Sequence, residues 1–326
     1  MRMAKANLRL VVTALLGVLA ASGTTHAQDY PAREIRSIVS VPPGTGMDIM
    51  IRYYSTKLSE LAGKPVIVEN KPGAQGNIAT EYVVRAKPDG YTIMLTPASA
   101  TLAAAVSFFK KLPFDPVNDL KPVVSLSSLG FVICVSGNSS SKSIAELTTA
   151  LKAKPGNGTF GTVSNTGIIA AELYKTRAGL ETNQVLYRGF PDSLNDLVNG
   201  QIDFITTDPT GAAGPIQSGR LRALAVTSVT RLASLPDIPT MIEAGFADFD
   251  LTPWIGLVVP ASTPDPIVSK LAAWHRQINE TEETKKVLLQ FGMNPLNEDA
   301  AAMAARLKSD IPKWAGFAKL ARIEPQ

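Results

Sequence analysis

The sequence predicts an α/β protein with a mostly parallel sheet. Short apolar runs that suit strands alternate with segments of helical periodicity, and the connections between them are short. The chain holds 24 glycines and 23 prolines, which implies many turns, and its hydrophobic fraction of 45% is that of an ordinary globular protein. A length of 326 residues suggests two domains, on a scale of roughly 150 residues per domain.

The strands are predicted from apolar runs, rich in β-branched residues, that stop at turns containing Gly, Pro, Asn or Asp. In chain order, strands are expected over residues 35–41, 65–68, 91–95, 123–135, 159–163, 185–187, 202–206, 221–226 and 251–260.

The helices are predicted from apolar residues at helical spacing and from start and stop signals. Met50, Tyr54 and Leu58 give the first helix its apolar face, with Asp48 near its start, and Gly63 is a natural stop. A capping box starts a later helix at residues 143–146. Helices are expected over about 48–62, 77–86, 143–154, 165–178, from about 192, about 209–218, 264–279, 281–291 and 298–320.

The domains are expected to be joined by strands that cross between them, because no Pro/Ser linker separates two halves. The apolar runs at 122–135 and 251–260 read as longer than their neighbours and are the best candidates for these crossovers. Domain 1 is then discontinuous, with residues 28–127 and 252–326, and domain 2 contains residues 128–251.

The N-terminus looks like a cleaved secretory signal. A basic start precedes the apolar stretch 10–21, and Thr25-His26-Ala27 supplies a small-x-small cleavage site. The alternative is a membrane anchor, but twelve apolar residues are too few for a bilayer that needs about 20. The sequence therefore predicts that residues 1–27 are removed and that the protein works in the periplasm.

Removal of this signal lowers the net charge of the chain and leaves few residues for catalytic or metal sites. Three basic residues leave with it, so the mature chain has 29 basic and 28 acidic residues, and no Lys/Arg cluster with interleaved aromatics suggests nucleic acid. His275 and Cys134 become the only histidine and cysteine. A Cys/His zinc site or a Ser-His-Asp triad is therefore hard to build, and we expect no catalytic residues, metal or cofactor.

Polar, Gly-rich turns follow several predicted strands and lead into helices, which is where open α/β sheets bind ligands. Backbone N–H groups at a helix start lack partners within the helix, and the helix dipole makes that end partly positive, so a carboxylate or phosphate is held there without a formal cation. The predicted binding residues are Pro43, Gly44, Thr45, Gly46, Met47 and Asp48; Thr96, Ser99, Ala100 and Thr101; Ser164, Asn165, Thr166 and Ile168; Tyr187, Gly189 and Phe190; and Asp208 and Pro209.

Individual residues leave alternatives open. Asp48 is either a structural N-cap or a ligand contact that accepts from a hydroxyl or amine, and Arg188 either pairs with a ligand carboxylate or extends into solvent. Gly44-x-Gly46 lacks the third glycine of a dinucleotide fingerprint. His275 is expected at a solvated helix position, whereas Trp254 and Cys134 are expected in the core.

An ordered set of motifs runs across nearly the whole mature chain. They are Tyr30-Pro31, Ile38-Val39-x-Val41-Pro42-Pro43-Gly44, Asp48, Val66-x-Val68-Glu69-Asn70-Lys71-Pro72-Gly73-Ala74, Gly76-Asn77-Ile78, Lys87-Pro88-Asp89-Gly90-Tyr91-Thr92, Lys111-Leu112-Pro113-Phe114-Asp115-Pro116, Tyr187-Arg188-Gly189, Gly200-Gln201-Ile202-Asp203, residues 219–227, residues 235–240, Glu243-Ala244-Gly245 and Trp254-x-Gly256. With these motifs in this order, the chain resembles the Bug/TctC family, the periplasmic solute-binding proteins of tripartite tricarboxylate transporters.

The resemblance implies a periplasmic binding protein (Venus-flytrap) fold with two discontinuous α/β domains and a ligand in the cleft between them. It further implies that backbone amides and waters grip a carboxylate and that the protein delivers it to a membrane permease. The sequence departs from the family pattern at several positions. Thr45 and Met47 stand where a glycine and a hydroxyl residue are common, Ile168 replaces a frequent histidine, Phe190 a small residue and Asp208 an asparagine.

These departures favour an aromatic or partly apolar acid over citrate-like tricarboxylates. The predicted function is capture of a small organic carboxylate by a monomer that serves a tripartite tricarboxylate transporter. Two alternatives stay open. One is a sensory module that reports the same ligand to a membrane kinase. The other is an exported enzyme that uses Asp48, Asp208 and Arg188.

Overall fold

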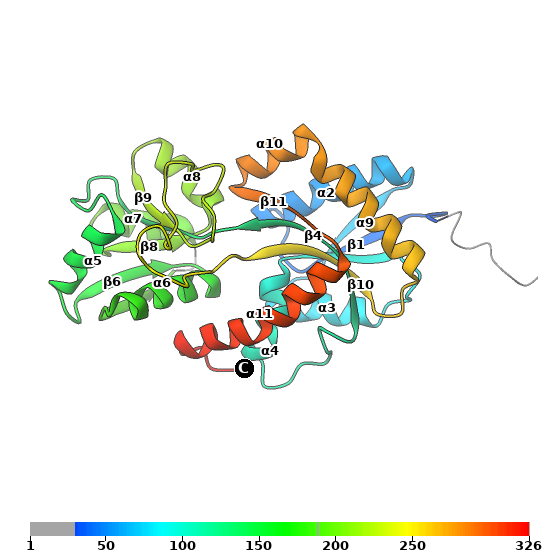
Figure 1. Ribbon diagram of the computed structural model, residues 1–326, viewed down its shortest axis with the longest axis horizontal. Coiled ribbons are helices and arrows are strands. Elements are labelled where there is room, and N and C mark those ends of the chain that lie inside the picture. Colours follow the sequence, from blue (N-terminus) through cyan, green and yellow to red (C-terminus); the bar gives the residue numbers. More distant parts are fainter. Residues whose placement is uncertain (1–29, 188, 326) are drawn as a thin grey trace, which may run out of the picture.

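Two lobes lie side by side in the computed structural model, which describes residues 30–187 and 189–325 (Figure 1). Each lobe is a β-sheet with helices packed on its faces. The predicted secretory signal, residue 188 and residue 326 fall outside the described residues. Within the described residues, no helix is long and apolar enough to cross a membrane.

Lobe 1 is built on a six-stranded mixed sheet with the strand order β11-β4-β10-β3-β1-β2. β1 pairs in parallel with β2 and β3, whereas β10 runs antiparallel to β3 and β4, and β11 antiparallel to β4. The prediction of a mostly parallel sheet is therefore wrong, because the chain returns through β10 and β11 in the antiparallel direction. The strands are β1 (Ile35–Val39), β2 (Val66–Asn70), β3 (Thr92–Thr96), β4 (Leu120–Leu129), β10 (Trp254–Pro260) and β11 (Met293–Glu298).

Lobe 2 is built on a five-stranded sheet with the strand order β7-β6-β8-β5-β9. β6 is parallel to β7 and β8, and β5 is antiparallel to β8 and β9. The strands are β5 (Val132–Ser136), β6 (Gly158–Thr162), β7 (Thr182–Leu186), β8 (Phe204–Thr207) and β9 (Leu221–Val226).

The helices cover both sheets, and α11 also reaches from lobe 1 toward lobe 2 (Figure 1). Those of lobe 1 are α2 (Gly46–Ala62), the single turn η1 (Ala74–Gly76), α3 (Asn77–Val84), the π-turn η2 (Ser99–Ala103), α4 (Ala105–Phe108), α9 (Asp265–Glu280), α10 (Glu282–Gln290) and α11 (Ala300–Leu320). Those of lobe 2 are α5 (Ile144–Lys152), α6 (Asn165–Ala178), α7 (Phe190–Val198) and α8 (Pro209–Gln217).

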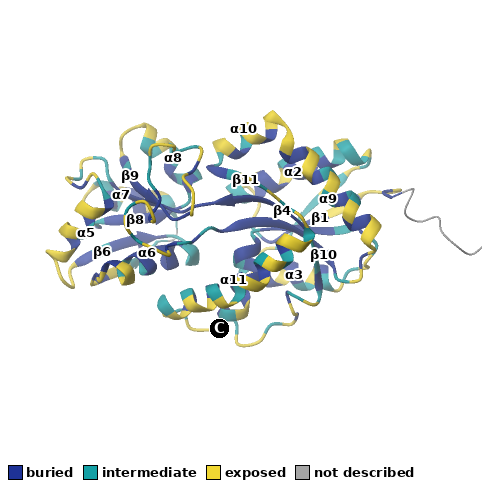
Figure 2. Cartoon of the chain, viewed as in Figure 1, coloured by how far each residue is buried: buried dark blue, intermediate teal, exposed yellow. Residues whose placement is uncertain are grey.

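The core of lobe 2 shows why β5 reads as a continuous apolar run. Along β5, Ile133 and Val135 join one hydrophobic cluster, while Val132 and Cys134 join another on the opposite face of the sheet. Successive side chains of a strand point to opposite faces, so a strand covered by helices on both sides must be apolar throughout. β5 is buried along nearly its whole length, and Figure 2 shows the central strands of this lobe in dark blue.

Two short segments connect the lobes, one between β4 and β5 and the other leading into β10. Thr227 ties them together. Its backbone N–H donates to the Phe131 carbonyl at 2.9 Å, and its hydroxyl donates to the Leu251 carbonyl at 2.8 Å. We propose that the chain divides into domains at these segments, close to the boundaries that the sequence predicts, because β1–β4, β10 and β11 form one sheet and β5–β9 the other.

The order of the predicted elements agrees with the structure, with three differences. The run at 123–135 contains the end of β4 and most of β5, separated at residues 130 and 131. The sequence does not predict β11, because Asn294, Pro295 and Asn297 disfavour strands; it forms an edge strand through pairing with β4. The short helical segments η1, η2 and α4 are not predicted either.

His275 corrects one expectation. The sequence predicts a solvated helix position, but the imidazole is fully buried in α9, stacked on the Tyr54 ring of α2 with ring centroids 6.4 Å apart. Its Nδ1 lies 2.8 Å from the Leu271 carbonyl. Burial lowers the pKa of His275 to about 4, so the ring is neutral at physiological pH. Trp254 and Cys134 are buried, as the sequence predicts.

Candidate functional site

The first predicted loop is organised around the start of α2. The Thr45 hydroxyl caps the helix by accepting from the Asp48 backbone N–H at 3.2 Å. Asp48 therefore occupies the third helical position rather than the N-cap, and its carboxylate accepts from the Gly44 N–H at 2.8 Å. Gly44 has a φ of 79°, a conformation that glycine adopts without strain.

Asp48 is also a buried charge with a full set of partners inside lobe 1. Its carboxylate accepts from Arg52 Nε at 2.9 Å and from Asn70 Nδ2 at 2.7 Å, and the side chain is 2% exposed. Burial opposes ionisation, but the hydrogen bonds from Arg52, Asn70 and Gly44 outweigh it and hold the pKa of Asp48 below its ordinary value. These contacts of Asp48 thus fix the loop between β1 and α2.

The second predicted loop follows β3 and is held by hydroxyl groups. Ser40, Thr96 and Thr101 form a chain of hydroxyls, with oxygen–oxygen distances of 3.0 and 2.7 Å. Ser99 is buried and accepts from the Trp254 N–H at 2.8 Å. Ala100, between them, is partly exposed. A side chain on Gly76 would collide with Thr101 and Ser40, so η1 packs directly against these hydroxyl residues.

The third predicted loop begins α6 in lobe 2. The Ser164 hydroxyl caps the helix by accepting from the Gly167 N–H at 3.2 Å. Asn165 and Thr166 occupy the first two helical positions and are partly exposed, while Ile168 is buried. No acidic residue lies in the first turn of α6.

The remaining predicted residues lie at the starts of α7 and α8. The Phe190 ring reaches α8, where an added Cβ on Gly211 would lie 3.7 Å from it. Asp208 caps α8 by accepting from the Gly211 N–H at 3.0 Å. Gly189 precedes α7 without a side-chain cap, and Pro209 begins α8 and is buried.

Tyr187 and Arg188 complete the predicted set. The Tyr187 hydroxyl donates to Asp196 of α7 at 2.7 Å, and burial followed by this neighbouring carboxylate raises the pKa of Tyr187 to about 12. The Tyr187 hydroxyl therefore has its hydrogen-bond partner within lobe 2. Arg188 lies outside the described residues.

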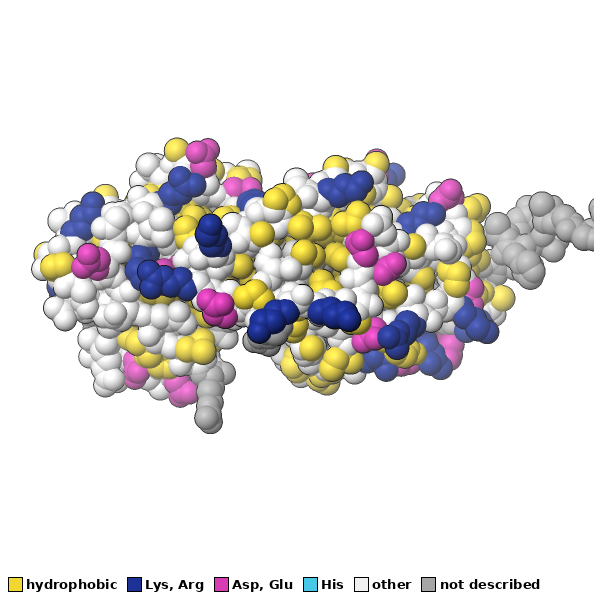
Figure 3. Space-filling model, turned by 90° about the horizontal axis from the view of Figure 1, so that it is seen from below, with side chains coloured by type: hydrophobic (Ala, Val, Ile, Leu, Met, Phe, Trp, Pro, Cys, Tyr) yellow, Lys and Arg dark blue, Asp and Glu magenta, His cyan; other side chains and the backbone are white. Residues whose placement is uncertain are grey.

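The predicted loops of the two lobes face each other. Asn165 at the start of α6 donates to the Gln75 side-chain oxygen of η1 at 3.3 Å. Thr210 at the start of α8 donates to the Phe291 carbonyl at 3.1 Å, and an added Cβ on Gly46 would lie 3.7 Å from the Thr210 methyl group. The loops after β1 and β3 and the starts of α6, α7 and α8 are thus neighbours along the line where the lobes meet, and Figure 3 shows a notch there.

The four helix starts differ in charge. Asp48 lies in the first turn of α2 and Asp192 in the first turn of α7, and Asp208 caps α8, so each of these starts already has a carboxylate nearby. The start of α6 carries only the neutral groups of Ser164, Asn165 and Thr166. An anion is stabilised by a helix start and repelled by carboxylates, so the start of α6 is best suited to an anion.

Within residues 30–187 and 189–325, no three His, Cys, Asp or Glu side chains are placed to hold a metal ion together.

Similar proteins identify the family of this chain. The family model described as "Tripartite tricarboxylate transporter family receptor" matches residues 50–319. The chain belongs to this receptor family. It is 30% identical over 318 residues to Protein BugT of Bordetella pertussis, which covers 96% of this chain and 97% of the relative.

Solved structures of similar proteins agree with the receptor fold. "R. palustris Rpa4515 with adipate" superposes with a TM-score of 0.79 at 27% identity, covering 91% of this chain and 100% of the other. "Structure of periplasmic binding protein BugD" gives a TM-score of 0.74 at 29% identity, with the same coverages. The two-domain α/β fold of periplasmic solute-binding proteins, predicted from the sequence, is therefore confirmed.

This member of the receptor family also places residues at the meeting line that the sequence does not single out. Ser40, Gln75 and Phe291 all contact predicted loops. Gln75 carries one local signal, because it stands between Gly73 and Gly76 and has a φ of 52°. Phe291 carries none, since it follows a helix that is remote in sequence.

Proposed function

We propose that this protein is a periplasmic receptor that captures a small organic carboxylate between its lobes and delivers it to the permease of a tripartite tricarboxylate transporter. Membership of the receptor family supports transport, and the signal-like residues 1–27 support export. The mature protein is proposed to act as a monomer without catalysis.

One observation carries this proposal. The start of α6, which has a neutral cap and no acid in its first turn, lies at the meeting line of the lobes, where Asn165 contacts Gln75. A carboxylate placed there would meet free N–H groups and the positive end of the helix. Because the site is assembled from both lobes, binding of the ligand would favour the closed arrangement by a hinge motion.

The ligand is proposed to be partly apolar. Met47 packs against the core of lobe 1, Phe190 against that of lobe 2, and Ile168 lies one turn into α6. Met47 and Phe190 are partly exposed and would offer apolar surface to the ligand, whereas Ile168 is buried. The similar protein Rpa4515 was solved with adipate, a dicarboxylic acid with a four-carbon apolar centre.

Calorimetry with adipate, benzoate, malate and citrate tests both parts of the proposal. We expect adipate or benzoate to bind at least about tenfold more tightly than citrate, which corresponds to about 1.4 kcal/mol. Asn165→Asp should weaken binding by a similar factor, because a carboxylate at the start of α6 repels the ligand. Asn157→Asp, an exposed turn position of lobe 2, is the matched control and should not change affinity. Tight binding of citrate or malate alone would reject the proposal that the ligand is partly apolar. The absence of binding heat with every acid would reject the proposal that the ligand is a carboxylate.

A further inference from the structure

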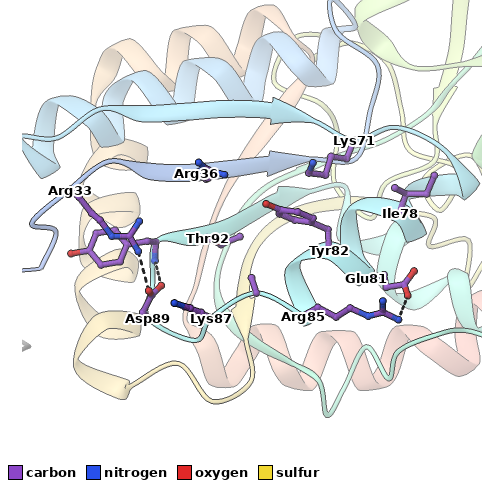
Figure 4. Close-up of a pocket in the computed structure, with 12 residues that line it drawn as sticks. Arg33, Arg36, Lys71, Ile78, Glu81, Tyr82, Arg85, Lys87, Asp89 and Thr92 are labelled. Atoms are coloured by element: carbon purple, nitrogen blue, oxygen red, sulfur yellow. Dashed lines mark hydrogen bonds and ion pairs between the residues drawn. The ribbon is translucent and has the colours of Figure 1, made fainter.

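Lobe 1 carries a second concave surface, away from the meeting line of the lobes. It is an open cavity of about 830 Å³ between α3, the loop before β3 and the outer face of β1 (Figure 4). We call it the basic basin. It is lined by Arg33, Arg36, Lys71, Ile78, Glu81, Tyr82, Arg85, Ala86, Lys87, Asp89, Tyr91 and Thr92.

The basic basin concentrates positive charge in a protein that is otherwise nearly balanced. Five of its lining residues are Arg or Lys and two are acidic. Across residues 28–326 the numbers of basic and acidic residues differ by one. The surplus of cations is therefore local, and such a patch attracts a partner of opposite charge.

The ion pairs in the basic basin lie at the surface, and Arg85 pairs there with Glu81, one helical turn away on α3. Arg36 and Lys71 share Glu69, at 3.5 and 3.7 Å. Arg33 pairs with Asp89 at 3.1 Å with its side chain 57% exposed, and Lys87 is in no ion pair with a described residue. Exposed pairs contribute little to stability, so these cations can exchange their partners for the carboxylates of an incoming chain.

Apolar surface accompanies the charge. Tyr82 and Ile78 lie four residues apart on α3, and both are exposed, Ile78 by 51%. The Lys71 ammonium lies 4.1 Å from the centre of the Tyr82 ring, and the Arg33 guanidinium 3.9 Å from that of Tyr91. Tyrosine and arginine around exposed apolar groups are typical of protein interfaces.

One segment links the basic basin to the meeting line of the lobes. Lys71 and Ile78 line the basin, while Gln75 between them accepts the hydrogen bond from Asn165 of lobe 2. Gly76 packs against Thr101 and Ser40, which fixes the path of this segment on lobe 1. Closure of the lobes therefore contacts the same short segment that forms one side of the basin.

We propose that the basic basin is the docking surface for an acidic segment of the membrane permease. The segment would carry several Asp or Glu side chains for the cations and an apolar residue for Tyr82 and Ile78. The contact between Gln75 and Asn165 makes docking stronger in the closed state. This inference rests on the proposed function, since it names the surface through which the receptor would meet its permease.

Retention of the purified protein on membranes tests the docking surface. The membranes come from the bacterium that produces this chain, with its permease present or deleted. The double variant Arg85→Glu/Lys87→Glu reverses charge in the basin, and Lys142→Glu/Lys152→Glu reverses two exposed charges at α5 of lobe 2 as the matched control. Calorimetry with adipate on all forms monitors the ligand site.

We expect retention only when the permease is present, and a loss of about tenfold with the basin variant but not with the control. Retention of the unchanged protein should also fall as NaCl rises from about 50 to about 300 mM, a readout that needs no variant. Adipate affinity should be the same in the unchanged protein, the basin variant and the Lys142→Glu/Lys152→Glu control. Gln75→Ala should abolish any increase in retention that adipate causes.

Two results would overturn this inference. In one, the basin variant is retained as well as the unchanged protein. In the other, the protein binds equally to permease-deleted membranes or to protein-free vesicles of anionic lipid, which would identify a lipid surface as the occupant. Failure of every acid in calorimetry would reject the carboxylate proposal separately, because the salt and charge-reversal results do not depend on ligand.

Discussion

The indole N–H of Trp254 donates to the carboxylate of Asp310 at 2.7 Å, and both residues are buried. This bond joins the first residue of β10, directly after the chain returns from lobe 2, to the middle of α11. Burial raises the pKa of Asp310, and the Trp254 hydrogen bond and the neighbouring Lys313 only partly offset this. The position of α11 therefore depends on a buried polar pair beside a crossover segment.

Replacing Asp310 with alanine should lower the free energy of unfolding by about 1–3 kcal/mol, because the buried indole N–H loses its acceptor. Asp310→Asn should cost less, since the amide oxygen still accepts. Urea unfolding at neutral pH measures both changes. Lys308→Ala, exposed on the same helix, is the control and should be nearly neutral. Equal stability of Asp310→Ala and the unchanged protein would show that the bond contributes nothing.

His275 should make the protein sensitive to mild acid. Burial lowers its folded-state pKa to about 4, whereas the unfolded chain titrates near the ordinary value of about 6.5. The unfolded state then binds the extra proton first, so stability falls as pH drops through this window. The expected loss between pH 7.5 and pH 5 is about 2 kcal/mol.

This pH effect can be isolated because His275 is the only histidine after residue 27. Unfolding of His275→Met should show a flatter pH dependence between pH 7.5 and pH 5 than the unchanged protein. Identical slopes for the two proteins would mean that His275 is not the titrating group.

Asp48 should make the protein sensitive to stronger acid than His275 does. Its folded pKa is held below the ordinary value, so its stabilisation is present above about pH 4 and is lost as pH falls through the folded pKa. Asp48→Asn should cost about 1–3 kcal/mol at pH 7, because three donors lose a charged acceptor, and the cost should shrink in acid. Equilibrium unfolding at pH 7 and pH 3 is the measurement, with exposed Asp237→Asn as control. If the loss of stability caused by Asp48→Asn does not change with pH, Asp48 does not stabilise the fold as an ionised carboxylate.

The contacts between the lobes should set the balance of open and closed forms. Asn165→Ala with Thr210→Val removes the two hydrogen bonds to Gln75 and Phe291. At about 1 kcal/mol each, their loss should shift the equilibrium toward the open form by roughly 30-fold.

Pulsed electron paramagnetic resonance measures this shift as the distance between spin labels at position 87 in lobe 1 and position 152 in lobe 2. Native Cys134 does not interfere, because burial raises its pKa to about 12. Ser218→Ala, which removes an exposed hydroxyl at the end of α8, is the control. An unchanged distance distribution would show that these bonds do not hold the lobes together.

Phe190 should select for apolar ligands. Phe190→Ser should weaken benzoate or adipate by about tenfold while changing malate by much less, since only the former present apolar surface to the ring. Calorimetry on the same acids measures this, with Phe109→Ser, which alters a partly buried ring at the core of lobe 1 outside the predicted loops, as a comparison. A uniform loss for all acids would instead indicate a damaged fold.

Much of the site is predictable because its loops sit at ends of strands that the sequence defines locally. Ser164 and its hydroxyl cap are identifiable from the strand, the polar turn and the helical pattern that follow one another. Gln75 and Phe291 are not, because their importance comes from contacts with the opposite lobe, which local periodicity does not describe.

The sequence by itself determined the α/β class, the order of the elements, the helix signals such as Gly63 and the family, because periodicity, turn residues and ordered motifs are local properties of the chain. Only the tertiary structure decided that His275 is buried, that β11 pairs with β4, and that η1 meets the start of α6. These outcomes depend on contacts between residues far apart in the sequence, and such contacts form only when the whole chain packs.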